Sequence, residues 1–181
     1  MKILRSLAAA LVAVALLSAS AQAADAVAGG KVKSVNAKDK QFVLTDSQGK
    51  DWTFTLGDEV TINRGGKEGV NDLAQGDAVN VCYDKGLTSM TAHYVLIQEG
   101  TTKNQELVHA VLKSYDADKK EVVLTDENKK DWTYAVGNAK VRRNNKTEAS
   151  IADIKIGDKL AAIVETVNGT PTLKLVMFKR T

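Results

Sequence analysis

The chain has 181 residues, of which 44% are hydrophobic and 5% aromatic, and its formal net charge is +3 at pH 7. Lys2 and Arg5 supply two of these positive charges, so the chain after them is close to neutral. Domains that bind nucleic acids through phosphate groups carry a marked basic excess. The charge therefore argues against nucleic-acid binding, and the single cysteine, Cys82, excludes an intramolecular disulfide.

Residues 1–23 have the pattern of a bacterial signal peptide. Lys2 and Arg5 form a positive n-region, residues 7–17 are an unbroken apolar run, and Ala21-Gln22-Ala23 is a small-x-small cleavage site. The apolar run is short for a membrane span, and no second one follows. We expect cleavage after Ala23, a periplasmic or secreted mature protein, and no transmembrane segment after cleavage. An uncleaved membrane anchor is the alternative.

The rest of the chain contains one pattern twice. Residues 33–57 align with residues 113–137 without a gap, and about half of the aligned residues are identical. Residues 60–79 align with residues 141–160 once a single insertion near Ala139 is allowed. Self-similarity of this length predicts two structural units of one kind.

The joint between the two units falls in a polar stretch that contains Gly100. We therefore expect a first domain at residues 24–98, a linker at residues 99–105 and a second domain at residues 106–181. The first domain is slightly acidic and the second slightly basic. Whether the two domains pack together or move independently stays open at this point.

Each unit contains a strand in which apolar and polar residues alternate. Trp52, Phe54 and Leu56 alternate with two threonines, and the second unit repeats the alternation from Trp132. Strict alternation with aromatic residues is typical of a strand that buries one face. We therefore expect Trp52 and Trp132 to lie in the core at matching places.

A hairpin connection precedes this strand. It runs over residues 46–50 in the first unit and over residues 126–130 in the second. The second connection lacks the glycine, so we expect Asn128 to take any position with positive φ. The recurring acids have two interpretations: they could bind a metal ion, or they could cap turns through backbone N–H groups, which we favour. These acids are Asp46, Asp51, Asp126 and Asp131.

The second half of each unit predicts a short helical turn and a final hairpin. Val70 and Leu73, like Ile151 and Ile154, are apolar residues three apart, as in a single helical turn, and a Gly-Asp pair follows. Counting strands on both sides of this turn gives about five in each unit. We predict an all-β protein of two tandem five-stranded OB-like barrels, each with a short helical turn, since closure removes exposed strand edges.

Four motifs occur in a fixed order: G-x-V-x-S-V, VLTD-x-x-G-K, W-T-F-T-L and D-L-x-x-G-D-x-V. This order resembles exported bacterial domains of unassigned function that have an OB-like fold. The resemblance covers residues 30–97 and 110–178. It implies the fold of each unit and brings no catalytic residues, because the motifs describe turns and core positions.

The sequence offers little for catalysis. His93 and His109 are the only histidines, they do not occupy matching places in the two units, and both lie in strand-like segments. No CxxC, HxH or HExxH motif indicates a metal site. Cys82 could be a reactive thiol, but its apolar surroundings favour a small buried residue. We expect no enzyme, no cofactor and no catalytic or metal residues.

The expected function is therefore binding. We predict an exported, non-enzymatic binding or interaction module of the bacterial envelope, whose partner is an unknown protein or small envelope ligand. The alternative is a periplasmic protein that binds an oligosaccharide or a metal ion. The candidates for a ligand face, chosen as aromatic or basic residues outside the expected cores, are Tyr83, Tyr94, Tyr115, Arg142 and Arg143.

Overall fold

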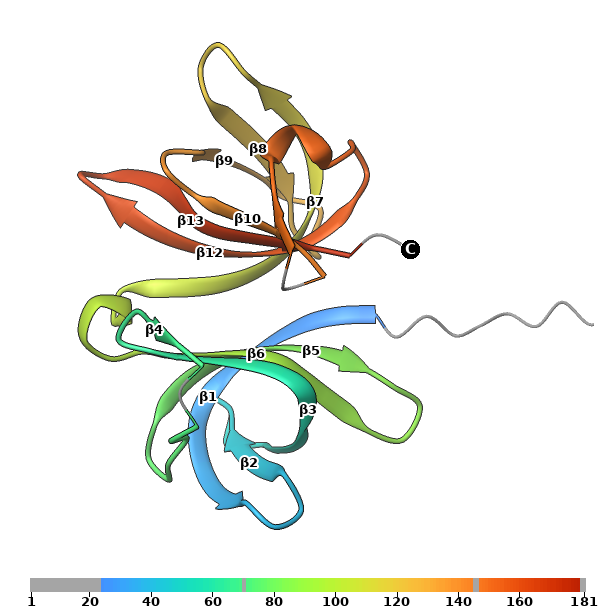
Figure 1. Ribbon diagram of the computed structural model, residues 1–181, viewed down its shortest axis with the longest axis vertical. Helices are drawn as coiled ribbons and strands as arrows, with labels where there is room; N and C mark the ends of the chain where they lie inside the picture. The colour runs from blue at the N-terminus through green and yellow to red at the C-terminus, as the bar shows by residue number, and fades with distance from the viewer. Residues whose placement is uncertain (1–23, 70, 145–146, 180–181) are drawn as a thin grey trace, which may run out of the picture.

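The computed structural model describes residues 24–69, 71–144 and 147–179, and these form two β-sheets (Figure 1). The predicted signal peptide lies outside the described residues. The first sheet contains β1 (Ala24–Asn36), β2 (Gln41–Thr45), β3 (Asp51–Arg64), β4 (Lys67–Glu68), β5 (Ala78–Lys85) and β6 (Met90–Ile97).

Five of these strands close into a barrel. β1 pairs with β2 and β5, β2 pairs with β3, and β6 pairs with both β5 and β3. The β3–β6 pairing is parallel and the others are antiparallel, which is the arrangement of an OB-like barrel. β4 adds a short hairpin at the end of β3. The predicted fold class is confirmed.

The second sheet repeats this order. It contains β7 (Gln105–Asp116), β8 (Glu121–Thr125), β9 (Asp131–Ala135), β10 (Lys140–Arg143), β11 (Thr147–Ala149), β12 (Lys159–Val167) and β13 (Thr170–Phe178). β9 and β10 together take the place of β3, and both pair in parallel with β13. The interruption between β9 and β10 contains Ala139, where the alignment needs an inserted residue.

Each barrel has its own hydrophobic core. In the first, the inward side chains include Phe42 and Phe54, whose ring centroids are 5.2 Å apart. In the second, Leu112, Val122 and Leu124 take part in the corresponding cluster. Along β2 and β8, buried residues alternate with half-buried ones, because successive side chains of a strand point to opposite faces.

Two local expectations need correction. Positive φ in the second hairpin falls on Lys129, at 64°, and not on Asn128, because Lys129 occupies the position that Gly49 has in the first. The helical turn is present in the second barrel as the 3₁₀ helix Ile151–Asp153, but residues 71–74 of the first barrel are not helical. Val70, the other residue of that expected turn, lies outside the described residues.

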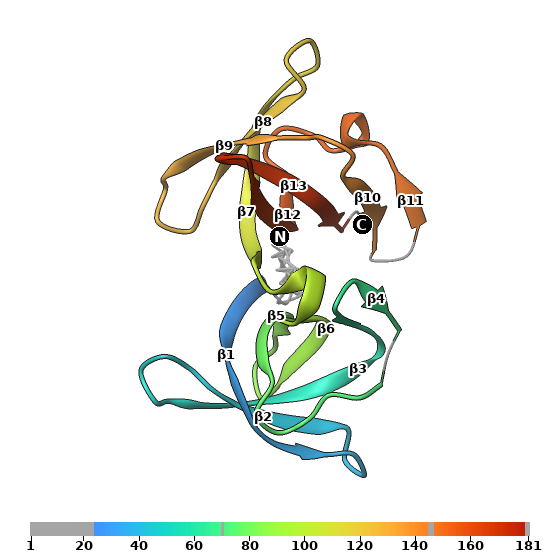
Figure 2. The same ribbon diagram turned by 90° about the vertical axis from the view of Figure 1, so that its left-hand side faces the viewer.

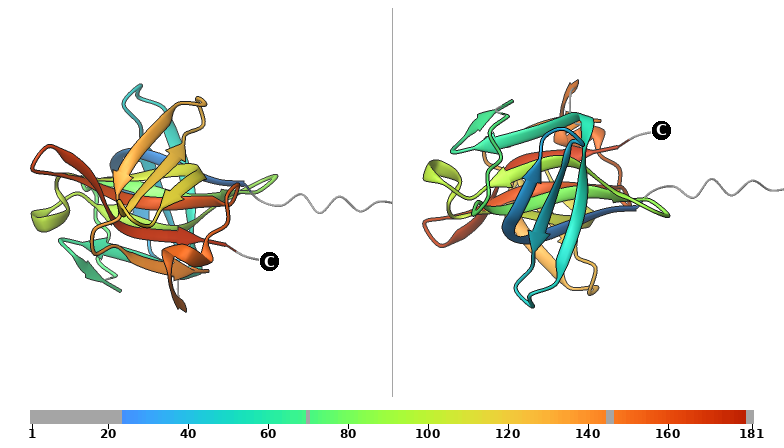
Figure 3. Two further views of the ribbon diagram at one scale, coloured as in Figure 1. Left: turned by 90° about the horizontal axis from the view of Figure 1, so that it is seen from above. Right: turned by 90° about the horizontal axis from the view of Figure 1, so that it is seen from below.

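The two barrels are stacked, and β5 and β6 of the first face β12 and β13 of the second (Figure 1). The views from above and below show these two strand pairs overlying one another (Figure 3). A 3₁₀ helix (Gly100–Thr102) leads from β6 into β7 beside this contact (Figure 2). In the described ranges, the structure contains no helix that is long and apolar enough to cross a membrane.

Candidate functional site

The contact between the barrels, here called the interbarrel interface, is a third hydrophobic cluster. Its buried members are Cys82, Tyr94, Leu96, Leu107, Ala161, Ile163, Leu175 and Met177, with Val27 packed against them. They come from the outward faces of the strands, whereas the inward faces fill the two barrel cores. The two barrels therefore pack against each other through an apolar interface.

The two sides of this interface use corresponding positions. In the first barrel Cys82 lies opposite Tyr94 in the β5–β6 ladder. In the second barrel Ile163 lies opposite Leu175 in the β12–β13 ladder. The same outward face of each barrel thus packs on its counterpart, as in an isologous contact between two subunits.

A polar network borders the apolar interface on the side where β4 and β10 lie (Figure 2). Arg142 donates to Glu68 twice, from Nη1 to Oε1 at 3.1 Å and from Nη2 to Oε2 at 2.6 Å. The Tyr94 hydroxyl donates to Glu68 Oε1 at 2.9 Å and accepts from Asn63 Nδ2 at 2.9 Å. One carboxylate from the first barrel thereby connects a buried tyrosine to an arginine of the second.

The ionisation of this network follows from burial and hydrogen bonding. Burial alone would raise the pKa of Glu68, but the hydrogen bonds from Arg142 and Tyr94 outweigh it and hold that pKa below its ordinary value. Burial raises the pKa of the Tyr94 phenol well above its ordinary value. Glu68 is therefore an anion, and Tyr94 a neutral hydrogen-bond donor, at neutral pH.

Beside this network lies a cleft of about 400 Å³, here called the interbarrel cleft. Both barrels and the connecting segment contribute to it. It is lined by Asn63, Gly66, Glu68, Tyr94, Thr102, Gln105, Lys140, Ile163, Lys174 and Leu175. Asn63 and Thr102 are buried polar residues, so two neutral hydrogen-bonding side chains lie at its wall.

The connecting segment is held against the first barrel and does not hang loose at the cleft. Thr102 donates from its hydroxyl to the Ile97 carbonyl at 2.6 Å, and Thr101 donates to the Gly65 carbonyl at 2.8 Å. Arg64 pairs with Glu99 at 2.5 Å, which ties the start of the segment to β3. The cleft wall that this segment forms is thus preorganised.

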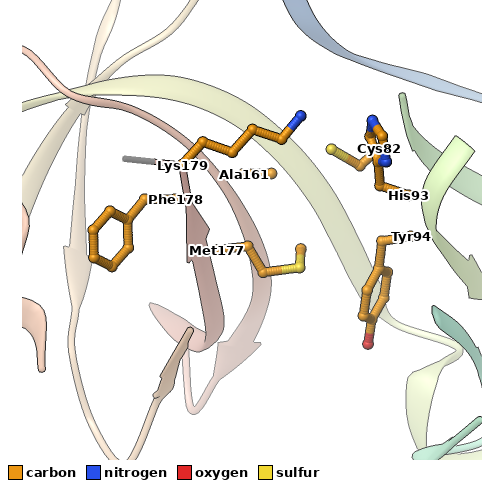
Figure 4. Close-up of a pocket in the computed structure, with 7 residues that line it drawn as sticks. All are labelled: Cys82, His93, Tyr94, Ala161, Met177, Phe178 and Lys179. Carbon is orange, nitrogen blue, oxygen red and sulfur yellow. The ribbon is translucent and has the colours of Figure 1, made fainter. Parts of the chain in front are cut away.

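A second, much smaller hollow of about 30 Å³ is also lined by Tyr94 (Figure 4). Its lining residues are Cys82, His93, Tyr94, Ala161, Met177, Phe178 and Lys179. Asp84 lies next to it, with Oδ2 at 2.7 Å from His93 Nε2 and Oδ1 at 2.7 Å from Lys179 Nζ. Tyr94 thus lines both spaces of the interface.

The five predicted ligand-face residues have different fates. The structure brings Tyr94 and Arg142 together through Glu68, but Tyr83 lies in the first core, edge-on to Phe54 at 5.0 Å. Tyr115 packs against the second core, and Arg143 lies 5.8 Å from the centre of the Phe178 ring. The expectation that Tyr83 and Tyr94 are exposed is wrong. The core of the first barrel covers Tyr83, and the second barrel covers Tyr94.

The two tryptophans also differ from the expectation. Trp52 packs at the edge of the first core, but Trp132 is 42% exposed. Each indole N–H donates to an aspartate of the preceding hairpin at 2.9 Å, and a lysine ammonium lies over each ring. The prediction that both indoles are buried is therefore wrong, because Trp132 is exposed and Trp52 is only half-buried.

Of the four recurring aspartates, two cap turns as favoured from the sequence. The other two, Asp51 and Asp131, instead accept from a lysine and a threonine side chain each. Asp46 accepts from the backbone N–H groups of Gln48 and Lys50, both at 2.9 Å, and Asp126 repeats this pattern. The indole hydrogen bond and these N–H groups hold the pKa of Asp46 below its ordinary value. In the part of the chain that the structure describes, no group of three or more His, Cys, Asp or Glu side chains is placed to hold a metal ion.

Cys82 and the histidines lie at or near the interface. Cys82 is buried, 6% exposed, which confirms the interpretation as a small buried residue. His93 pairs with Asp84, and His109 Nδ1 lies 3.2 Å from Glu127 Oε1. Neither contact combines a histidine with a serine or cysteine nucleophile.

Comparison with known proteins adds little to this geometry. No protein-family model matches the chain, and no curated protein matches it. Solved structures that resemble it include one described as "Crystal structure of Ag(I)CusF", which is 12% identical, covers 41% of this chain and 97% of its own, and superposes with a TM-score of 0.34.

Proposed function

We propose that this chain is an exported, non-enzymatic binding protein of the bacterial envelope, and that it binds a small, negatively charged polar ligand in the interbarrel cleft. The observation that carries the proposal is the cleft itself, about 400 Å³ in volume and lined by both barrels. Ligand sites of this size combine apolar walls with a few fixed polar groups. Ile163 and Leu175 supply the apolar wall, and Asn63, Tyr94 and Thr102 supply polar groups.

The charges of the cleft favour an anion. The carboxylate of Glu68 is neutralised by Arg142, and that of Glu165 pairs with Lys174 at 2.8 Å. Lys140 lines the cleft, where its positive charge helps to lower the pKa of Glu68. A carboxylate or phosphate group placed there would gain a charge-assisted hydrogen bond from this lysine.

The same lining residues support binding without catalysis. None of them is a histidine, serine or cysteine, and the hydroxyl of Thr102 donates to a backbone carbonyl and not to a general base. The pKa of Glu68 is lowered, and an anion held by arginine is a poor proton donor and a weak base. These groups position a ligand, and none is arranged to transform it.

An oligosaccharide ligand held on exposed aromatic rings has less support. Tyr83 and Tyr94 are buried, and lysines cover the rings of Trp52 and Trp132. A sugar that also bears a carboxylate would suit the cleft through its charge.

The test compares two probes that differ in one group, D-glucuronate and D-glucose, with citrate and phosphate as further anions. Residues 24–181 are titrated calorimetrically with each probe. We expect the anions to bind and glucose not to bind. The variant K140Q/K174Q should lose this binding, while the exposed control K38Q should keep it. Equal binding of glucose and glucuronate, or binding unchanged in K140Q/K174Q, would refute the proposal, as would the failure of every anion to bind.

A further inference from the structure

The first barrel contains a cavity of about 430 Å³ beside its core, here called the first-barrel cavity. Its apolar lining includes Ile62, which is buried in that core, and Leu56 and Leu73, which pack against it. The β3–β6 ladder is interrupted between Leu56 and Thr61, and three residues of the interruption, at positions 57, 58 and 60, also line the cavity. The mouth of a β-barrel is a common place for a small-molecule site, and this volume is ordinary for one.

In the second barrel, a capped 3₁₀ helix occupies the corresponding stretch of chain. The Ser150 side chain accepts from the backbone N–H of Ala152 at 3.3 Å, and Asp153 accepts from the backbone N–H of Ser150 at 2.8 Å. Such a cap stabilises the start of a helix because it satisfies backbone N–H groups that have no partner within the helix. Ile154, the next residue, is buried in the second core, so the capped turn closes this part of the barrel.

The first barrel lacks the residues for this cap. Gly69 stands at the position of the capping serine and has no side-chain oxygen to accept a hydrogen bond. Asp72, the counterpart of the capping aspartate, pairs instead with Arg64 at 3.0 Å. Residues 71–74 are not helical, and Leu73, at the position of the buried isoleucine, is only half-buried and lines the cavity.

A difference of one side chain shows which kind of molecule the cavity fits. Val35 lies opposite Phe42 in the β1–β2 ladder. Tyr115 lies opposite Val122 in the β7–β8 ladder and so holds the equivalent position. The Tyr115 side chain packs against the second core, whereas Val35 is 37% exposed and lines the cavity. The second barrel thus places a phenol ring of its own at the position where the first barrel has a valine and a cavity.

We propose that the first-barrel cavity binds a small, neutral aromatic molecule of the phenol class, which takes the place that the Tyr115 side chain has in the other barrel. Its ring contacts Val35, Leu56 and Ile62, and its hydroxyl group lies at the rim. The cavity shares no lining residue with the interbarrel cleft, so this proposal is independent of the anionic ligand suggested above.

The charged residues at the rim favour a neutral ligand with a hydroxyl group. Lys40 and Asp58 both line the cavity and are exposed, and Lys40 Nζ lies 2.9 Å from Asp58 Oδ1. Because the two charges neutralise each other, an ionised ligand gains little there. The Asp58 carboxylate can accept a further hydrogen bond, since its two oxygens carry several lone pairs. A phenol hydroxyl donates to it, and an aromatic ring without a hydroxyl group does not.

The test maps amide chemical shifts on residues 24–181 during titration with p-cresol, which corresponds to the tyrosine side chain, and with toluene, which lacks the hydroxyl group. We expect saturable changes at Val35, Leu56 and Ile62 with one dissociation constant. p-Cresol should bind about threefold or more tighter than toluene, because only p-cresol makes the hydrogen bond. D58A should remove this preference and leave the binding of toluene unchanged. No saturable change with p-cresol, or changes confined to the interbarrel cleft, would overturn the proposal.

Two matched variants test whether the cavity itself is the site. V35Y places in the cavity the ring that the second barrel carries, and it should abolish the saturable changes. V167Y adds the same ring at a valine of similar exposure outside the cavity, 39% against 37%, and it should bind p-cresol as the wild type does. The wild-type map locates the site even if V35Y folds poorly. Unchanged binding by folded V35Y, or a preference for p-cresol that persists in D58A, would overturn the proposal.

Discussion

Arg142 of the second barrel holds Glu68 of the first through both oxygens of the carboxylate, across 74 residues of sequence. The two side chains are only 17% and 30% exposed. A bidentate pair of this kind is directional as well as attractive, so it sets the orientation of one barrel on the other. The apolar interface lies beside it and supplies the packing.

Removing either partner should destabilise the protein. We expect E68Q and R142M each to cost about 1–3 kcal/mol, because hydrogen bonds to charged groups are lost at a partly buried place. The double variant should cost less than the sum of the two, since the partners interact directly. Urea unfolding of the four proteins measures this coupling. The exposed pair Lys40–Asp58 is the control, and its cycle should show no measurable coupling. If the costs of E68Q and R142M in unfolding free energy simply add in the double variant, the contact between the two side chains is contradicted.

The same pair predicts how stability changes with pH. The pKa of Glu68 is lower in the folded protein than its ordinary value of 4.5. Its contribution to stability is therefore complete above that value and is lost as the pH falls through the folded pKa. The difference in unfolding free energy between wild type and E68Q should stay constant from pH 7 to about pH 5 and shrink in more acidic solution. If the difference in unfolding free energy grows on acidification, the pKa of Glu68 is not lowered in the folded protein.

The two tryptophans should respond differently to a quencher. In the single-tryptophan variants W52F and W132F, the remaining indoles report separately. Trp132 is 42% exposed, whereas Trp52 packs against the first core, so acrylamide should quench W52F, which keeps Trp132, more strongly than W132F. W52A should also cost more stability than W132A, because only the loss of the Trp52 side chain leaves a cavity at the edge of a core. Equal quenching of both indoles would contradict the difference in exposure between Trp52 and Trp132.

Separated halves test the interbarrel interface. Residues 24–105 and 106–181 should each fold, because each contains a complete barrel with its own core. Each half alone would expose its side of the interface, so the two should associate when mixed, and amide spectra should change at interface residues such as Leu96 and Leu107. If the spectra of the halves overlay everywhere on that of the intact protein and the halves do not associate, the interface contributes nothing to holding the barrels together. Two unfolded halves would show that neither barrel is a domain.

The sequence predicted the barrels because their information is local. Alternation along residues 41–45 shows which side chains face inward, and the aspartate at position 46 marks a turn that the structure confirms. The burial of Cys82 followed from its apolar neighbours in the same way.

The interface could not be predicted in this manner. Alternation shows that Tyr94 faces outward from its barrel, but it does not show that a second barrel covers that face. Glu68 gave no signal, because it lies in a strand of only two residues and its partner Arg142 is remote in sequence. The tryptophans could not be placed either, because strand periodicity weakens at a hairpin end, where each indole turns toward an aspartate of the hairpin.

The most direct test of ligand binding between the barrels is a map of amide chemical shifts on residues 24–181 during titration with D-glucuronate. Binding in the interbarrel cleft predicts saturable changes at Gly66 and Glu68 of the first barrel, at Gln105, and at Lys140 and Lys174 of the second, all with one dissociation constant. Changes confined to one barrel, such as at a β2–β3 or β8–β9 hairpin, or no saturable change at any amide, would contradict a binding site formed by both barrels.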